Sequence, residues 1–254
     1  MNKITKEEAF SRGLPKWPQM LVKGTSVTVE QAKEIIFATD TALNSIWSCG
    51  TNDKEFEDWF LEATGYNQLR CEYELGTLMT EAERHRRSRI FYAREQAFMD
   101  RAGFLRTEYV YNSWASSCFV NGPAGWCHPD GTISFIYNVG KWPDVETVYN
   151  EWSQIAQRWP FLDLWVTLMN DECCEDGHPV VTFHVHGGEV GIYDGTLEPV
   201  AGLPPEPEFD ALSWARQVSG TTYDHEHGLP EAWIDEFVDR VRPIVNAVVE
   251  EFPI

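Results

Sequence analysis

The hydrophobic pattern of this 254-residue chain changes its period after Gly103, and this change limits the folds that the chain can adopt. Before Gly103, apolar residues recur mainly at three- and four-residue steps, which is typical of amphipathic helices. After Gly103, apolar and polar residues alternate, as in residues 133–139, which is typical of half-buried strands. The pattern therefore predicts an α+β protein in which a helical N-terminal part, residues 1–103, packs on an antiparallel sheet.

Capping boxes mark the starts of three predicted helices in the N-terminal part. Thr5, Thr28 and Thr80 are each followed three residues later by Glu or Gln, so each hydroxyl can accept a hydrogen bond from the third backbone N–H of a helix. The predicted helices end near Gly13, Trp47 and Gly103. Between the first two helices, residues 13–20 contain two prolines and are predicted as an extended loop.

The second half of the chain predicts one sheet that is crossed by a helix. The strand at 133–139 is followed by an amphipathic helix, which Asp144 can cap and Pro160 ends. Two further strands are predicted at residues 162–168 and 180–187, and residues 189–193 add either a short fourth strand or a hairpin return. The order β-α-β-β in one sheet is the core of a ferredoxin-like sandwich, which we expect over residues 104–195.

Residues 196–254 are predicted as a Pro-rich acidic linker followed by C-terminal helices. Four prolines between residues 196 and 210 indicate a stiff connector. The last helix is predicted to begin near Pro230, which suits a first turn, and to kink at Pro243, which removes a backbone donor.

Negative charge is concentrated in the C-terminal part of the chain. Residues 1–106 contain 15 basic and 16 acidic residues, a net charge of −1, whereas residues 107–254 contain 5 and 24, a net charge of −19. A surface this negative repels nucleic-acid phosphates and anionic membranes, so neither is expected as a partner. A protein with a basic surface is the partner that this charge would attract and orient.

Features of the termini and cysteines predict a cytoplasmic protein. The N-terminus lacks the apolar core of a signal peptide, and no apolar stretch is long enough to span a membrane. The six cysteines include no C-x-x-C pair and are too few for a disulfide framework in a chain of this length.

Several segments between Tyr109 and Asp194 resemble the YubB-type ferredoxin-like domain of phage and plasmid proteins. They are NVGKWPD (138–144), WPFLDLWVTLM (159–169) and PVVTFHVHGGEV (179–190). Two more, GLPKWPQMLVKGTSVTVEQAKEII (13–36) and GPAGWCHPDG (122–131), resemble uncharacterised phage and bacterial proteins. The resemblance implies the fold and a mobile-element setting, and hence the cytoplasm of a host cell. It implies no activity and brings no catalytic residues.

The longest predicted helix carries arginines close to an apolar stripe. These arginines either cover the edge of a buried seam, dock on the acidic part of the chain, or bind an anion beside an aromatic ring. The turn at 122–131 either presents its indole ring to such a ligand or closes the sheet edge. The candidate residues for a nucleotide-like small molecule are Arg84, Arg87, Arg94, Trp126, His128 and Trp142.

Two histidines have a spacing that would suit a metal site. His184 and His186 lie two residues apart on a predicted strand, so both rings project from one face. Cys173, Cys174 or His178 from the neighbouring turn would complete a zinc set by ligand type. The alternative is a polar sheet face with two ordinary histidines. A second His-x-His, at 225–227, is predicted to lie in a solvated turn.

Sequence signatures of catalysis are absent, which favours a binding function. The chain contains no G-x-S-x-G, no Walker-type G-x-x-x-x-G-K and no dinucleotide-binding G-x-G-x-x-G. The leading hypothesis is a non-enzymatic accessory protein of a phage or other mobile element that binds a basic host protein through its acidic surface. The alternatives are a protein that binds or sequesters a nucleotide-like anion, and a metal-dependent hydrolase that uses His184 and His186. Zinc would be the cofactor of that last alternative.

Overall fold

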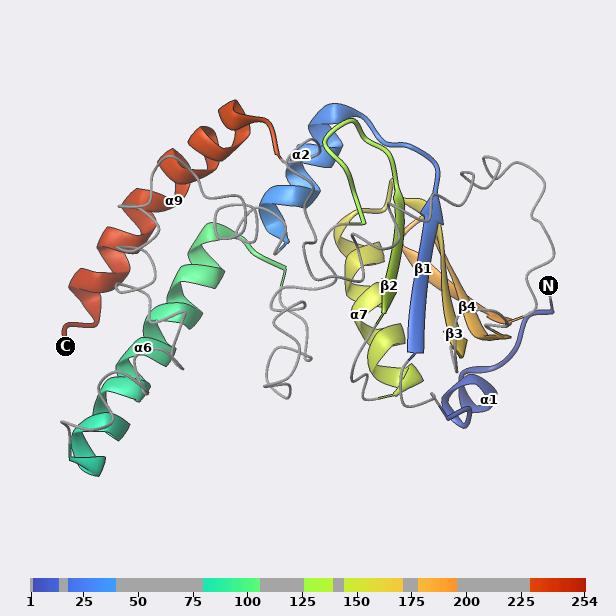
Figure 1. Cartoon of the computed structure of the whole chain (residues 1–254), viewed down its shortest axis with the longest axis horizontal. Coiled ribbons are helices and arrows are strands. Elements are labelled where there is room, and N and C mark those ends of the chain that lie inside the picture. Colours follow the sequence, from blue (N-terminus) through green and yellow to red (C-terminus); the bar gives the residue numbers. More distant parts are fainter. Residues whose placement is uncertain are drawn as a thin grey trace. The chain divides into compact units, whose positions relative to one another are not determined.

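The computed structural model describes residues 2–13, 18–39, 80–105, 126–138, 144–170, 178–195 and 229–254 (Figure 1). In these residues the chain is α+β, as the change in hydrophobic period predicts. The chain divides into two compact units, Met1–Thr41 with Leu105–Thr222, and Ala42–Phe104 with Tyr223–Ile254. These units cross the predicted boundaries, because the first 41 residues belong with the sheet and the last 32 belong with the long helix that precedes Gly103.

In the described residues of the first unit, five strands form one antiparallel sheet. In chain order they are β1 (Pro18–Gly24), β2 (Ser134–Asn138), β3 (Asp163–Asn170), β4 (His178–His186) and β5 (Glu189–Asp194). In the sheet the order is β2-β1-β3-β4-β5, and each neighbouring pair is antiparallel. Strands β2 and β3 therefore run parallel to each other on either side of β1, and the helix α7 (Val145–Arg158) connects them. This is a split β-α-β arrangement.

The central position of β1 corrects the prediction for the N-terminal part. Residues 13–20 were expected as an extended loop within a helical region, but the chain from Pro18 forms a strand between β2 and β3. Met20 and Val22 are fully buried and alternate with half-buried neighbours. The alternation covers too few residues, directly after two prolines, to stand out as a strand pattern. The sequence also predicts strands at residues 105–111, where apolar and polar residues alternate, and at residues 114–120; both lie outside the described residues except for Leu105.

The three predicted capping boxes begin helices in the structure. Helices α1 (Lys6–Phe10), α2 (Val29–Ala38) and α6 (Glu81–Ala102) each follow a threonine whose hydroxyl accepts a hydrogen bond from the third backbone N–H, at 3.1 to 3.2 Å. Helix α2 ends earlier than Trp47, because Thr39 has an extended backbone. Helix α6 ends at Gly103, whose φ of 77° is the left-handed conformation that glycine adopts freely.

The hydrophobic core of the first unit lies between α7 and one face of the sheet (Figure 1). Helix α7 contributes Val145, Val148, Trp152, Ile155 and Ala156. The sheet contributes Met20, Val22, Leu164, Val166, Leu168, Val181, Phe183, Val185 and Ile192, all of which are buried. These strand residues alternate in sequence, so the residues between them lie on the opposite face.

The N-terminal residues are bonded to the outer strand of the sheet. The backbone N–H of Ile4 donates to the carbonyl of Ile192 over 3.0 Å, and that of Asp194 donates to the carbonyl of Asn2 over 2.8 Å. Arg12 forms an ion pair with Asp194 at 2.8 Å, and this bond lowers the pKa of the Asp194 carboxyl. These residues therefore belong to the sheet rather than to a separate helical part.

The second unit contains α6 and the C-terminal helix α9 (Glu231–Glu251), which contact each other. Phe98, Phe104 and Phe237 form an aromatic cluster between them, with ring centroids 5.7 and 6.1 Å apart. Pro243 lies within α9, as predicted. None of the helices in the described part of the chain is both long and apolar enough to cross a membrane.

We predict that Phe183→Ala lowers the free energy of unfolding by about 3–5 kcal/mol, because it leaves a cavity in the fully buried layer between β4 and α7. Phe161→Ala serves as the matched control, since Phe161 is 39% exposed and should change stability by about 0.5 kcal/mol or less. Urea denaturation of the full chain measures both. Equal losses would contradict the placement of the core.

Candidate metal centre

The face of the sheet opposite α7 carries polar and aromatic side chains on β3 and β4. The register pairs Asp163 with His186 and Trp165 with His184. These four residues alternate with the buried core residues of the same strands, so their side chains share one face. The pairing places an aspartate from the start of β3 beside the two histidines at the end of β4.

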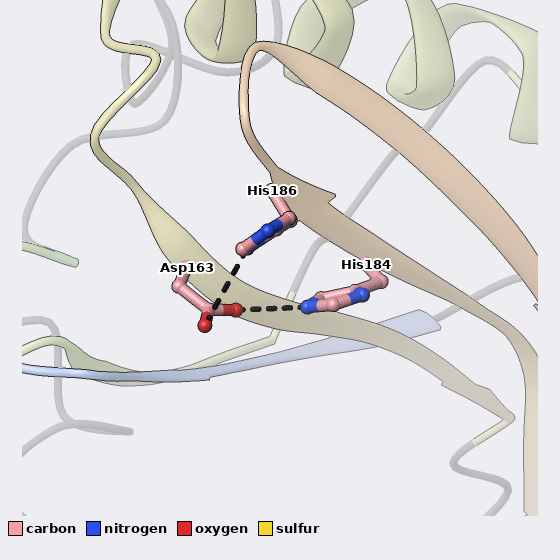
Figure 2. A group of neighbouring side chains, drawn as sticks. All are labelled: Asp163, His184 and His186. Atoms are coloured by element: carbon pink, nitrogen blue, oxygen red, sulfur yellow. Dashed lines mark hydrogen bonds and ion pairs between the residues drawn. The ribbon is translucent and has the colours of Figure 1, made fainter.

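The three side chains of this group converge on one another (Figure 2). The Nε2 of His184 lies 2.8 Å from Oδ1 of Asp163, and the Nδ1 of His186 lies 3.5 Å from Oδ2 of the same carboxylate. One ligand atom from each residue lies within 4.8 Å of the other two. Two imidazoles and a carboxylate therefore point at one small volume.

Neighbouring aromatic rings hold His184 in place. The indole of Trp165 stacks on the His184 imidazole, with centroids 3.9 Å apart and ring planes 2° from parallel. The ring of Tyr193 lies 5.4 Å from that indole. A Cβ at Gly191, which is paired with His184 across the strands, would lie 3.0 Å from the Tyr193 ring. The absence of a side chain at residue 191 therefore leaves room for this ring, and packing of this kind orients a ligand side chain in advance.

The site is open toward solvent on one side. The exposed fraction of the side chain rises from 24% for His184 to 46% for Asp163 and 65% for His186. An ion can therefore reach the site from water without a change in the core. The formal charge of −20 also raises the local concentration of cations around the protein.

The ligand types and their spacing fit a first-row transition metal. Two histidines and a carboxylate hold catalytic zinc in known hydrolases, and the same set holds non-haem iron. Donors that bind one zinc ion tetrahedrally at about 2.1 Å lie about 3.4 Å from one another. The two histidine nitrogens lie 2.8 and 3.5 Å from different oxygens of Asp163, and one donor atom of each residue lies within 4.8 Å of the others, so a bound ion would draw the three side chains closer together. A metal held here would be bound by the lone pair of the imidazole nitrogen that faces Asp163, so that nitrogen would carry no proton in the metal-bound protein.

Two of the residues predicted as zinc ligands join this group, and one lies far from it. His178 pairs with Asn170 at the opposite end of β4, six residues before His184. A strand rises about 3.3 Å per residue, so the backbones of His178 and His184 are about 20 Å apart. His178 is thus excluded from the site. Cys173 and Cys174 lie outside the described residues.

Asp163 is the candidate ligand that sequence reasoning missed. It lies 21 residues before His184, which is not the spacing of the short zinc and calcium motifs that sequence reading uses. It becomes visible once β3 and β4 are paired, because it is the first residue of β3 and faces the end of β4. The available signal for Asp163 was an acidic residue in a predicted strand whose other residues are apolar on one face and mixed on the other.

The three arginines predicted to bind an anion lie in different environments. Arg94 is buried, donates from Nε to the carbonyl of Phe252 over 2.8 Å, and has a pKa lowered by burial. It therefore joins α6 to the end of α9 and is not available as predicted. Arg87 forms an ion pair with Glu83 at 2.9 Å. Together with Arg86, it lowers the pKa of Glu83 to about 2. Arg84 is exposed.

The remaining predicted ligand residues have structural roles or lie outside the described chain. Trp126 is 1% exposed and packs against Trp152 and Trp159, so it closes the core and cannot stack on a ligand. The Nε2–H of His128 donates to the carbonyl of Ser134 over 2.9 Å and ties the turn to β2. Trp142 lies outside the described residues. Trp126 and His128 belong to the first unit, whereas the arginines belong to the second.

Cys127, next to His128, is not a nucleophile. It is buried, and desolvation, with a contribution from the charge of Asp130, raises the pKa of its thiol to about 12. The thiolate is the reactive form of cysteine, and it is scarce at neutral pH when the pKa is this high.

We predict that replacing both histidines, His184→Ala with His186→Ala, weakens Zn²⁺ binding by at least about 100-fold. Loss of a hydrogen-bond partner behind a ligand already costs about 10- to 100-fold, and loss of two ligands costs more. The control replaces the other His-x-His pair, His225→Ala with His227→Ala, and should leave the affinity unchanged. Isothermal titration calorimetry measures both, and a loss confined to the control would show that the site is elsewhere.

No protein-family model, curated protein or solved structure matches this chain. The assignment of a function therefore rests on the geometry of Asp163, His184 and His186.

Proposed function

We propose that the protein is a metal-dependent hydrolase that holds Zn²⁺ with Asp163, His184 and His186. The observation that carries the proposal is the convergence of these three side chains from β3 and β4, with one donor atom of each within 4.8 Å of the others. Two histidines and a carboxylate are among the ligand sets of catalytic zinc, where three protein groups bind the ion and a fourth position holds water.

The open position supplies the chemistry that hydrolysis needs. Zinc held by three protein ligands lowers the pKa of its bound water to about 7, so a nucleophile is present at neutral pH. The exposed side of the site, at His186, is where water and a substrate can approach. The half-buried side, where Trp165 stacks on His184, keeps the ligands in fixed orientations.

The charge of the chain favours substrates that are neutral or cationic. A formal charge of −20 repels phosphate esters, whereas it does not repel uncharged carboxylic esters and amides. An acyl compound without negative charge is therefore the substrate class that we propose.

We predict that the zinc-loaded protein hydrolyses 4-nitrophenyl acetate faster than bis(4-nitrophenyl) phosphate, relative to free zinc at the same concentration. Asp163→Asn should lower the zinc-dependent kcat/KM for the acetate by at least about tenfold, because the variant loses an anionic ligand. Asp235→Asn is the matched control, since it removes one negative charge from an exposed position on α9. Hydrolysis that survives a chelator, or that Asp163→Asn leaves unchanged, would contradict the proposal.

The charge distribution supports a second candidate function, binding of a host protein. In this proposal the chain is a non-enzymatic accessory protein of a phage or other mobile element, with a YubB-type ferredoxin-like fold. Residues 107–254 carry a net charge of −19, which would attract and orient a basic partner in the host cytoplasm. The nucleotide-binding alternative has less support, because Arg94 and Trp126 are buried.

We predict for this second function that the tagged full chain captures a basic protein from bacterial lysate at low salt and releases it at about 0.5 M salt, where charges are screened within about 4 Å. Mass spectrometry of the eluate identifies the partner. A captured protein that resists salt, or the recovery of none, would count against binding through the acidic surface.

A further inference from the structure

The hairpin between β4 and β5 places a glutamate next to the metal ligands. Its two loop residues, Gly187 and Gly188, have φ values of 60° and 86°, which are the left-handed conformations of a type I′ turn. A two-residue turn of this type fixes the register of the strands that it joins. In that register His186 lies directly opposite Glu189.

Asp163, His186 and Glu189 therefore form one row across three strands on the polar face of the sheet. Side chains that are directly opposite on neighbouring strands have Cβ atoms about 4.5–5.5 Å apart. The next row consists of Trp165, His184 and Gly191, and thus offers no side chain on β5 beside His184. Glu189 is the acidic residue of β5 on this part of the face.

Glu189 is close to the metal ligands without belonging to them. Its carboxylate is not part of the group whose donor atoms lie within 4.8 Å of one another. Its side chain is exposed, as is that of the neighbouring His186. It therefore lies on the solvent side of the site, which is the side that the three ligands leave uncovered.

We propose that Glu189 lies beside the open coordination position of the metal, accepts a hydrogen bond from the water bound there, and excludes anions from it. The inference rests on the proposed function, because it needs a metal at Asp163, His184 and His186. It adds to that function by assigning the discrimination between anionic and uncharged substrates to Glu189. The carboxylate repels a phosphate or carboxylate that approaches the metal, whereas an uncharged ester is admitted.

The test measures anion binding to the full chain loaded with Co²⁺, which replaces Zn²⁺ and has a visible spectrum that responds to its ligands. Thiocyanate is titrated into the wild-type protein and into Glu189→Gln, Glu189→Asp and Glu231→Gln. Glu231→Gln is the matched control, because it removes one exposed carboxylate from the start of α9. Circular dichroism verifies that each variant is folded.

We expect Glu189→Gln to bind thiocyanate about fourfold more tightly than the wild type. This ratio corresponds to about 0.8 kcal/mol, the repulsion between unit charges about 5 Å apart in water. Glu189→Asp keeps the charge and should remain close to the wild type, as should Glu231→Gln. In kinetic assays, Glu189→Gln should lower the preference for 4-nitrophenyl acetate over bis(4-nitrophenyl) phosphate.

Other outcomes would overturn the inference, and they differ from a failure of the metal site itself. Equal thiocyanate affinity in the wild type and Glu189→Gln shows that the carboxylate is not beside the open position. Loss of Co²⁺ binding in Glu189→Gln shows that Glu189 is a ligand instead. A spectrum that no thiocyanate concentration changes shows that no position is open. If wild-type protein binds no Co²⁺, the proposed function fails first.

Discussion

The register between β3 and β4 is the constraint on which the candidate site depends, because it decides which side chains of the two strands face each other. Leu164, Val166 and Leu168 alternate along β3, as Val181, Phe183 and Val185 do along β4, and all six are buried on the α7 face. A slip of one residue would move one of these sets to the other face, at the cost of several buried side chains. Burial of the core thus holds Asp163 opposite His186 and Trp165 opposite His184.

The two faces of the sheet have different roles: one packs into the core, and the other carries the candidate site. The α7 face contains the large apolar residues of the strands, including the fully buried Phe183, which pack against α7. The opposite face contains a hydrogen-bonded pair of buried threonines, Thr167 and Thr182, whose hydroxyl oxygens are 3.1 Å apart, and beyond them the aromatic and histidine cluster. A polar face is free to carry ligands because the core on the other side already supplies the packing.

Local signals in the sequence were sufficient for many elements of the fold. Capping boxes located the starts of three helices, and the pattern of apolar residues located β3 and β4 to within about two residues. These signals depend on neighbours in the chain, so they can be recognised without the fold. The position of β1 could not be predicted in this way, because its partners, β2 and β3, are more than 100 residues away.

The site shows the same division between local and long-range information. The His-x-His spacing on β4 was visible, because alternation within one strand is a local property. Asp163 was not, since its approach to the histidines is a consequence of strand pairing. For Arg94 and Trp126 the sequence left both a ligand-binding and a structural interpretation open. The structural one depends on residues distant in the chain, as Arg94 depends on the end of α9.

The parallel stack of Trp165 on His184 gives this protein an internal optical reporter. The indole lies against one ligand of the site at 3.9 Å, whereas Trp126, Trp152 and Trp159 are enclosed within the core. A paramagnetic ion such as Cu²⁺ quenches fluorophores at short range. Of the chain's 11 tryptophans, Trp165 would therefore lose more fluorescence than Trp126, Trp152 and Trp159 when such an ion is bound at the site. The emission spectrum of the unlabelled protein would then follow metal exchange in real time.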